Sequence, residues 1–475
     1  MILKRFFDPK LAQTSYLIGC ASKGTALVID ANRDIDQYLQ AAKSEGVAIT
    51  HVTETHIHAD FVSGSTELAQ RTGAALYLSD EGTEGWKYEF VNECNAVLLK
   101  DGDQFQVGNI SVDAVHTPGH TPEHLSFLVT DTAAASKPIG MITGDFVFVG
   151  DVGRPDLLEK AAGIEGSKDA AARALFQSLQ KFREYPDWLQ IWPGHGAGSA
   201  CGKGLSAVPH STVGYERRFN WAFGMTNEDE FVTLVLAGQP DPPRYFAEMK
   251  RVNKAGPSIP GDIRKVPRIP PAHLADITST GSLVIDVRPA AVYAAGHVPG
   301  TINIPLDRRF TTWAGWLIPY DRDLYLIVDD ACADCLLEAT RDLAMIGLDR
   351  IAGFFGSDVL GSWREDQGRL AVVPHIDITT LSERIRRREV NVLDVRDQAE
   401  WQAGHLADVP NIPLGQLAAR LDEIPRDKPL VVHCQSGARS AIAVSLLAAC
   451  GIPEVINLAG GFAAWKSSAM GWSRE

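Results

Sequence analysis

The chain has 475 residues, of which 45% are hydrophobic and 22% are charged. This length exceeds that of one ordinary domain and predicts about three domains. Its 45 Lys and Arg against 59 Asp and Glu give a formal net charge of -14, which argues against nucleic-acid or anionic-membrane binding as the main activity.

The sequence shows no feature that predicts export or membrane insertion. Residues 1–19 scatter charges through their apolar positions and lack the uninterrupted apolar core of a signal peptide. No window is long and apolar enough to predict a membrane span. The 7 cysteines are an odd number spread over a large chain, which is not the framework of a disulfide-rich secreted protein. We therefore expect a cytoplasmic protein with no membrane partner.

Residues 1–240 alternate short apolar runs with helical stretches such as 170–182. The runs at 26–30, 75–78 and 126–129 have the length and composition of buried strands. This alternation predicts a first domain of α/β class, a sheet sandwich covered by helices.

Side chains that bind metals begin to gather at residues 55–61, whose sequence is THIHADF. On a strand, His56 and His58 point to the same face, and such a pair alone is as often hydrogen-bonded as metal-bound. A two-metal hydrolase built on this pattern would carry a histidine where this chain has Phe61. The segment therefore indicates a single metal ion.

Two further segments extend the pattern, His120 in HTPGH and Asp145 in TGD, each after an apolar run that predicts a strand. Their order resembles the metallo-β-lactamase fold and, within it, the persulfide dioxygenases. The resemblance implies that His56, His120 and Asp145 hold iron. Two histidines and one carboxylate suit a non-heme Fe(II) oxygenase, because they leave positions for substrate and O₂. Zinc could bind the same side chains.

Other residues near this site are expected to support it without binding metal. In the dioxygenases, the position of His58 lies beside the iron, and Asp60 is expected to be a hydrogen-bonding carboxylate. His195, in PGH, stands where two-metal relatives bind their second ion, and we expect it to donate a hydrogen bond near the cleft. His124 has no ligand role in the family and is expected to be structural.

A glycine-rich loop after His195 carries Cys201 and Lys203. Lys203 could lower the pKa of Cys201 and give a thiolate that accepts a sulfane sulfur. The alternative is an incidental loop thiol. The resemblance favours the first interpretation, because a cysteine of this loop takes part in persulfide handling in the fusion proteins described below.

Two more segments resemble later motifs of the persulfide dioxygenases. The first contains Arg154, which is a candidate for contacting substrate but could instead pair with Asp151 or Asp156. The second contains Tyr215, which is a candidate for contacting the thiol part of the substrate.

Eight prolines lie between Gln239 and Pro271. Proline at this density prevents regular helix and central strand, so we predict an extended linker at 241–271.

After the linker the sequence repeats itself. The stretches LVIDVR at 283–288 and NIPL at 303–306 return as NVLDVR at 391–396 and NIPL at 411–414. A repeat of about 100 residues is the size of a domain. Both copies resemble rhodanese domains, which are α/β folds with a mostly parallel sheet, and we place them at 272–370 and 371–475.

The second copy carries CQSGARS between a strand-like run and a helical run. This stretch resembles the rhodanese active-site loop, in which backbone N–H groups and a helix N-terminus stabilise the thiolate and persulfide of the cysteine, here Cys434. Gly437 permits the tight curl, Arg439 supplies fixed positive charge, and Gly437 and Ser440 are candidates for contacting substrate.

The first copy lacks this loop. Alignment places Asp330 opposite Cys434 and Cys335 opposite Arg439, so both the nucleophile and its cationic partner are missing. We expect a catalytically silent domain used in packing or assembly. Cys332 and Cys335 have the spacing of a redox pair or of half a zinc site, but no second pair completes a four-thiolate site, and a redox role stays open.

The order of the three domains resembles persulfide dioxygenase–rhodanese fusions of the CstB type, which act in sulfide detoxification. The resemblance implies one Fe(II) per chain and O₂ as co-substrate in oxidising a low-molecular-weight thiol persulfide to sulfite. Sulfur transfer at the rhodanese cysteine can then yield thiosulfate. We expect a homo-oligomer with the small thiol persulfide, sulfite or thiosulfate as its partners.

Two other functions remain open at this stage. One is a glyoxalase-II-like zinc thioester hydrolase fused to a sulfurtransferase, which usually needs two metals and is therefore disfavoured by Phe61. The other is a non-enzymatic sulfur carrier with a structural metal, which the open three-ligand set disfavours.

Overall fold

The computed structural model describes the chain except residues 158, 160–165, 240, 260–264, 469–470 and 474–475. The chain divides into two compact units, Met1–Gly261 with Ala344–Gly347, and Asp262–Leu343 with Leu348–Glu475. Among the described residues, no helix has the length and apolar character needed to cross a membrane.

The first unit contains two six-stranded sheets. The first sheet, in spatial order, consists of β1 (Ile2–Asp8), β2 (Gln13–Cys20), β3 (Thr25–Ile29), β4 (Ala48–Thr53), β5 (Ala75–Ser79) and β6 (Val97–Leu99). The second sheet, also in spatial order, consists of β12 (Ser211–Thr212), β11 (Gln190–Pro193), β10 (Gly140–Gly144), β9 (Leu125–Asp131), β8 (Ile110–His116) and β7 (Gln104–Val107).

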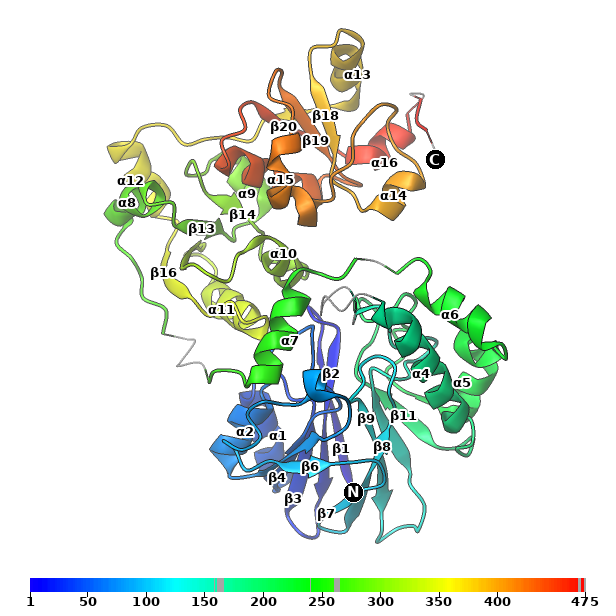
Figure 1. The fold of residues 1–475 in the computed structure, drawn as a ribbon. Helices are drawn as coiled ribbons and strands as arrows, with labels where there is room; N and C mark the ends of the chain where they lie inside the picture. Colours follow the sequence, from blue (N-terminus) through cyan, green and yellow to red (C-terminus); the bar gives the residue numbers. More distant parts are fainter. Residues whose placement is uncertain (158, 160–165, 240, 260–264, 469–470, 474–475) are drawn as a thin grey trace. The chain divides into compact units, whose positions relative to one another are not determined.

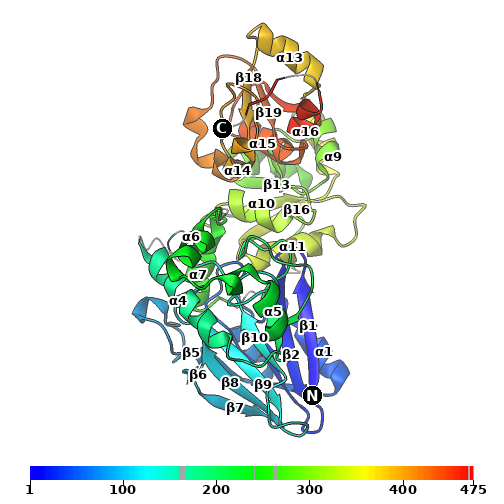
Figure 2. The same ribbon diagram turned by 90° about the vertical axis from the view of Figure 1, so that its right-hand side faces the viewer.

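Helices cover both outer faces of this sandwich (Figures 1 and 2). The first sheet carries α1 (Asp36–Glu45) and α2 (Ser65–Thr72), and the second carries α4 (Ser167–Phe182), α5 (Val213–Phe219) and α6 (Glu228–Leu236). Short 3₁₀ turns are η1 (Glu84–Trp86) and η2 (Trp221–Gly224). The predicted α/β sandwich with two inner sheets is confirmed.

The strand period explains why β2 and β3 are buried along their length. Ile18 and Leu27 point into the core between the two sheets, whereas Leu17 and Val28 pack on the other side with Tyr38 of α1. Successive side chains of a strand point to opposite faces, so a strand covered on both sides reads as one continuous apolar run.

The segment expected to be an extended linker contains a helix, α7 (Tyr245–Ala255). The expectation was wrong for these residues because the prolines lie before Arg244 and after Gly256, which leaves an uninterrupted stretch of good helix formers. Residues 260–264 of the predicted linker lie outside the described residues. The first compact unit accordingly extends past the predicted boundary at 240.

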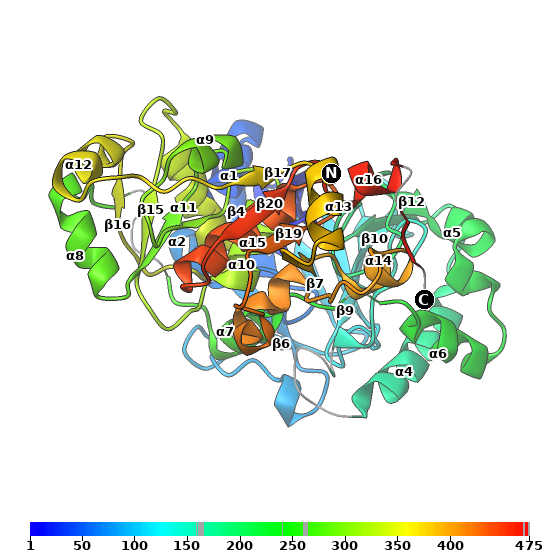
Figure 3. The same ribbon diagram turned by 90° about the horizontal axis from the view of Figure 1, so that it is seen from above.

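The second unit contains two four-stranded sheets in which every pairing is parallel. In spatial order, the first is β14 (Ile302–Asn303), β13 (Leu283–Asp286), β15 (Leu324–Ile327) and β16 (Ile351–Phe355), and the second is β17 (His375–Ile376), β20 (Val455–Leu458), β19 (Leu430–His433) and β18 (Asn391–Asp394). Figure 3 shows β17, β20 and β19 side by side. The predicted pair of α/β domains is confirmed.

Helices connect these parallel strands, as parallel pairing requires. The first copy has η3 (Pro271–His273), α8 (Leu274–Ser279), α9 (Ala290–Ala295), α10 (Phe310–Leu317), α11 (Cys335–Met345) and α12 (Val359–Asp366). The second has α13 (Ile378–Arg386), α14 (Gln398–Gln402), η4 (Leu414–Ala419), η5 (Leu421–Glu423), α15 (Ala438–Ala449) and α16 (Gly461–Lys466).

The repeated Asp-Val-Arg stretch forms a buried ion pair in each copy. Arg288 Nη2 lies 2.5 Å from Asp286 Oδ2, and Arg396 Nη2 lies 2.6 Å from Asp394 Oδ2. Arg396 also donates to the carbonyl of Gly404 at 2.8 Å. These contacts tie the ends of β13 and β18 to the Gly-His turns that follow them, so the repeated motif is structural, as expected.

The two copies share an interface within the second unit. The N–H of Asn303 at the end of β14 donates to Ser445 Oγ of α15 at 2.9 Å. The ring of Trp316 lies so close to Gly415 that a Cβ there would be 2.4 Å from Trp316 Cε3. Glycine at this position therefore permits the approach of the two copies.

We predict that Arg396→Ala destabilises the second copy by about 3–5 kcal/mol, because Asp394 would remain buried without its cation. Urea unfolding of the full chain, followed by tryptophan fluorescence, measures the loss. Arg420→Ala is the control, since its partner Glu423 is exposed and a screened pair contributes little. Equal urea midpoints for the two variants would contradict the role of the buried pair.

Candidate functional site

Three of the predicted side chains lie together in the first unit. His56, His120 and Asp145 each offer one ligand atom, and these atoms all lie within 4.8 Å of one another. His120 Nε2 is 3.5 Å from Asp145 Oδ2, and all three residues are buried. They follow β4, β8 and β10, so the ends of three strands deliver them to one place. We call these three residues the first cluster.

The outer nitrogen of each imidazole has a hydrogen-bond partner. His56 Nδ1 lies 2.9 Å from Thr55 Oγ1, and His120 Nδ1 lies 3.1 Å from the carbonyl oxygen of Arg154, to which it can donate. These bonds leave Nε2 of each ring for the cluster, and such bonds fix the orientation of metal-binding histidines.

The backbone of Asp145 is held by His124. The N–H of Asp145 donates to His124 Nε2 at 3.1 Å, and His124 Nδ1 lies 2.8 Å from Thr117 Oγ1. Asp145 Oδ2 is buried and has no hydrogen-bond partner among the described residues. A buried oxygen without a partner is costly unless a cation binds it. The donor set and this free oxygen fit a divalent metal ion.

Protonation also favours metal binding. Burial lowers the pKa of His56, with His58 and His120 contributing, and burial lowers the pKa of His120. Burial alone would raise the pKa of Asp145, but the facing imidazoles of His195 and His120 hold it below its usual value. Neutral imidazoles and an ionised carboxylate are the forms that bind metals.

His58 lies beside the first cluster, and its Nε2 is bound to Asp30. Its Nε2 is 3.1 Å from Asp30 Oδ1, and its ring packs on Phe61 at a centroid distance of 4.4 Å. Although burial lowers it, the Asp30 carboxylate raises the pKa of His58 to about 9. Sequence reasoning missed Asp30, which also accepts the N–H of Thr55 at 2.7 Å. Its position directly after a strand-like run was the available signal.

A second cluster adjoins the first. Asp60, His195 and Cys201 each offer a ligand atom within 4.8 Å of the others, and all are buried. His195 Nε2 lies 3.3 Å from Asp60 Oδ2 and 3.4 Å from Asp145 Oδ1, so Asp145 faces both clusters. His195 Nδ1 donates to the carbonyl of Ala12 at 3.0 Å. Cys201 is therefore buried beside Asp60 and His195.

The expected activation of Cys201 by Lys203 is wrong. Lys203 Nζ donates to the backbone carbonyls of Leu234 and Ala237 at the end of α6. The last carbonyls of a helix have no partner within the helix, so they are available to this ammonium group. Burial raises the pKa of the Cys201 thiol well above its usual value, and the carboxylates of Asp145 and Asp60 raise it further.

The structure does not bring Arg154 and Tyr215 to the site as substrate contacts. Arg154 is fully buried, with Nε and Nη2 donating to the two oxygens of Asp156 at 3.0 and 2.7 Å. Tyr215 is 52% exposed on α5, where its ring contacts Phe219. Arg154 is thus structural, as its alternative pairing with Asp156 allowed.

In the second unit, the CQSGARS loop curls around the sulfur of Cys434. The N–H of Gly437 donates to Cys434 Sγ at 3.2 Å, and Ser440 Oγ lies 3.6 Å from it. Ser440 Oγ also donates to Asn457 Oδ1 at 2.7 Å. Gly437 has φ 107°, a conformation that side chains disfavour. The helix α15 begins directly after this glycine and adds its N-terminal dipole.

Arg439 does not stand alone beside this sulfur. Its Nη1 and Nη2 donate to the two carboxylate oxygens of Glu400 at 2.6 and 2.8 Å. Sequence reasoning missed Glu400, which lies on α14 and had no motif of its own. Its bidentate pairing fixes the guanidinium in one orientation and offsets part of its charge.

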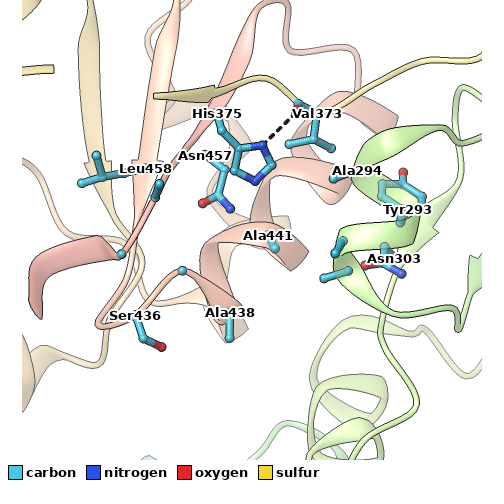
Figure 4. A pocket seen from close by; sticks show the side chains of 15 residues that line it. Tyr293, Ala294, Asn303, Val373, His375, Ser436, Ala438, Ala441, Asn457 and Leu458 are labelled. Atoms are coloured by element: carbon cyan, nitrogen blue, oxygen red, sulfur yellow. Dashed lines mark hydrogen bonds between the residues drawn. The ribbon is translucent and has the colours of Figure 1, made fainter. Parts of the chain in front are cut away.

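A cavity of about 290 Å³ opens beside the loop (Figure 4). Ser436 and Ala438 of the loop line it, and His375 and Asn457 lie across from them. Asn303 of the first copy also lines it, and its Oδ1 is buried without a hydrogen-bond partner among the described residues. Residues of both copies therefore line this cavity.

The corresponding loop of the first copy ends in a disulfide between Cys332 and Cys335. Asp330, at the position of the nucleophile, pairs with Arg268 at 2.9 Å. The first copy therefore lacks a rhodanese-type nucleophile, and the two cysteines form a bonded pair in the structure.

Family profiles agree with this division. The metallo-beta-lactamase superfamily matches residues 8–195, and the rhodanese-like domain matches residues 271–354 and 377–468. A crystal structure of a metallo-beta-lactamase from Staphylococcus aureus subsp. aureus COL is 44% identical, covers 75% of this chain and 99% of its own, and superposes with a TM-score of 0.69.

Two further relatives are more distant. The mitochondrial persulfide dioxygenase ETHE1 of Bos taurus is 27% identical over 244 residues, which are 50% of this chain and 80% of the relative. A hydroxyacylglutathione hydrolase of Rhodospirillum rubrum is 29% identical over 180 residues, which are 38% of this chain and 60% of the relative. The first unit thus resembles both an oxygenase and a hydrolase.

We predict that His120→Ala removes bound metal, whereas His58→Gln retains it, because Nε2 of His58 is bound to Asp30. Elemental analysis of the purified full chain should give about one metal ion per chain for the parent and for His58→Gln. Loss of metal from both variants to the same extent would show that His58 is a ligand.

Proposed function

Because the chain belongs to the metallo-beta-lactamase superfamily and continues into two rhodanese-like domains, we propose that it is a non-heme iron persulfide dioxygenase coupled to a sulfurtransferase. The observation that supports this most is the buried set of two imidazoles and one carboxylate, His56, His120 and Asp145, with Phe61 where a further metal-binding histidine would stand. The similarity to a persulfide dioxygenase supports the same function.

Fe(II) held by this set would supply the redox chemistry that O₂ requires, with coordination positions left for substrate. The balanced reaction is R–S–SH + O₂ + H₂O → R–SH + SO₃²⁻ + 2 H⁺. The chain's own residues hold the ligands in place: Thr55 and the Arg154 carbonyl orient the two imidazoles, and His124 positions Asp145. Buried Phe61 and Phe148 beside the clusters exclude water.

Sulfur transfer takes place at Cys434 in this proposal. Its thiolate attacks the outer sulfur of a donor, giving Cys434–S–S⁻ and the donor's leaving group, and sulfite then removes that sulfur as thiosulfate and regenerates the thiolate. The N–H of Gly437 and the start of α15 stabilise both anions. Sulfite from the first unit would serve as acceptor, and thiosulfate would be the joint product.

A zinc thioester hydrolase is the second candidate. The second cluster favours it, because Asp60, His195 and Cys201 could hold a second metal ion beside the first. The similarity to a hydroxyacylglutathione hydrolase points the same way. A hydrolase would use two metals to generate hydroxide, so metal content and substrate distinguish the two functions.

We predict oxygen uptake by the anaerobically purified, iron-containing chain when glutathione persulfide is supplied, with sulfite and thiosulfate together formed in an amount equal to the oxygen consumed. Uptake should be lost in Asp145→Asn, which keeps the shape of the side chain but removes its negative charge. Tyr215→Phe is a control outside the site and should retain activity. Hydrolysis of a hydroxyacylglutathione without oxygen uptake would instead support the hydrolase.

We also predict that Cys434→Ser abolishes sulfur transfer from thiosulfate to cyanide and retains oxygen uptake on a supplied persulfide, because separate domains carry the two reactions. Cys201→Ser is the matched control: it removes a buried thiol of the first unit and should leave this transfer unchanged. Sulfur transfer that survives in Cys434→Ser would place the nucleophile elsewhere.

A further inference from the structure

The disulfide of the silent copy lines a cavity that the functions above do not use. This cavity of about 500 Å³ lies within the second unit, and both copies contribute to it. Cys332 and Cys335 face it from the first copy, and Arg439 and Ile442 of α15 face it from the second. In its own domain the disulfide lies between β15 and α11, the place that corresponds to the loop of Cys434 between β19 and α15.

The two sulfurs differ in a way that favours reaction in one direction. Cys332 is exposed, whereas Cys335 is partly buried and is the first residue of α11, a helix of 11 residues. A thiolate at a helix N-terminus is stabilised by the helix dipole, and a stabilised thiolate is the better leaving group. Attack by an incoming thiolate is therefore expected at Cys332, with Cys335 as the leaving sulfur.

The walls of the cavity carry both positively and negatively charged side chains. Arg309 is exposed, and no ion pair or side-chain hydrogen bond to its guanidinium is found among the described residues. Asp307 and Asp329 supply carboxylates, and Trp313 supplies an apolar surface. A ligand with a carboxylate for Arg309 and an ammonium group for the aspartates matches these walls.

We propose that this cavity is a thiol–disulfide exchange site for a small thiol that carries both carboxylate and ammonium groups. The first thiolate forms an R–S–S–Cys332 bond while the Cys332–Cys335 bond breaks, and the electron pair goes to Cys335 as thiolate. A second thiolate attacks the sulfur of R in this mixed disulfide and releases R–S–S–R and the Cys332 thiolate. Two thiols are oxidised and the protein disulfide is reduced to a dithiol.

This activity depends on neither the iron nor Cys434. Thiol–disulfide exchange gives the first copy a chemical role at the position where the second copy has its rhodanese loop. The exchange proposal therefore stands or fails independently of the proposed dioxygenase activity. The full chain, with its other sites intact, can be used to test it.

Reduced glutathione is the probe, with 2-mercaptoethanol as a thiol that carries neither charge. Differential alkylation followed by peptide mass spectrometry measures the rate at which Cys332 and Cys335 become reduced. Arg309→Ala should slow reduction by glutathione about fivefold, the effect of losing one solvent-exposed ion pair, and leave reduction by 2-mercaptoethanol unchanged. Arg308→Ala removes the neighbouring exposed arginine, which does not line the cavity, and should change neither rate.

A second measurement traps the intermediate. In Cys335→Ser, glutathione disulfide should form a glutathione adduct on Cys332, with one glutathione released as thiol, and adding Arg309→Ala should slow its formation. Equal effects of Arg308→Ala and Arg309→Ala, or no adduct on Cys332 under conditions that modify the exposed Cys450, would overturn the proposal.

Discussion

The carboxylate of Asp145 faces both clusters of metal-ligand side chains, and the arrangement of the cleft depends on how it is held. Its N–H is bound by His124, its oxygens face His120 and His195, and the chain around it tolerates no added bulk. A Cβ at Gly153 would lie 1.8 Å from the carbonyl oxygen of Asp145, and one at Gly194 would lie 2.7 Å from its Oδ1. Close backbone approach at two glycines therefore sets the position of the carboxylate.

The ligands themselves were predictable because each belongs to a short motif at the end of a strand. His56, His120 and Asp145 need only the sandwich fold to meet, since that fold brings the ends of their strands together. The residues that orient them were harder to foresee. Asp30 is 26 residues before His56, and the Arg154 carbonyl is 34 residues after His120; their hydrogen bonds leave no periodic or motif signal in the sequence.

Long side chains account for the errors. Lys203 lies two residues from Cys201, but its four-carbon stem reaches the free carbonyls at the end of α6. Arg154 pairs with Asp156 through a fully buried bidentate contact, which is one of the two alternatives that the sequence left open. For such residues, nearness in sequence is a poor guide to the hydrogen-bond partner. The partner is whichever unsatisfied polar group the fold places within reach of the side chain. The helix α7 was missed for a different reason: proline density was averaged over a segment whose middle contains none.

The duplicated domains show how one scaffold can carry different chemistry. Both keep the buried Asp–Arg pair, which follows β13 in one copy and β18 in the other, and both place a loop between a parallel strand and a helix, after β15 and after β19. This loop carries the chemical difference, with a cysteine that accepts the N–H of Gly437 in one copy and a disulfide in the other. A rigid scaffold with an interchangeable loop is a common arrangement for functional sites.

The central claim is that a single iron ion lies in the first cluster. Anomalous diffraction from crystals of the anaerobically purified chain, recorded on both sides of the iron absorption edge, tests it most directly. One iron peak at bonding distance from His56 Nε2, His120 Nε2 and the Asp145 carboxylate is the predicted result. Two peaks, the second between Asp60, His195 and Cys201, or a peak that appears only at the zinc edge, would contradict the account.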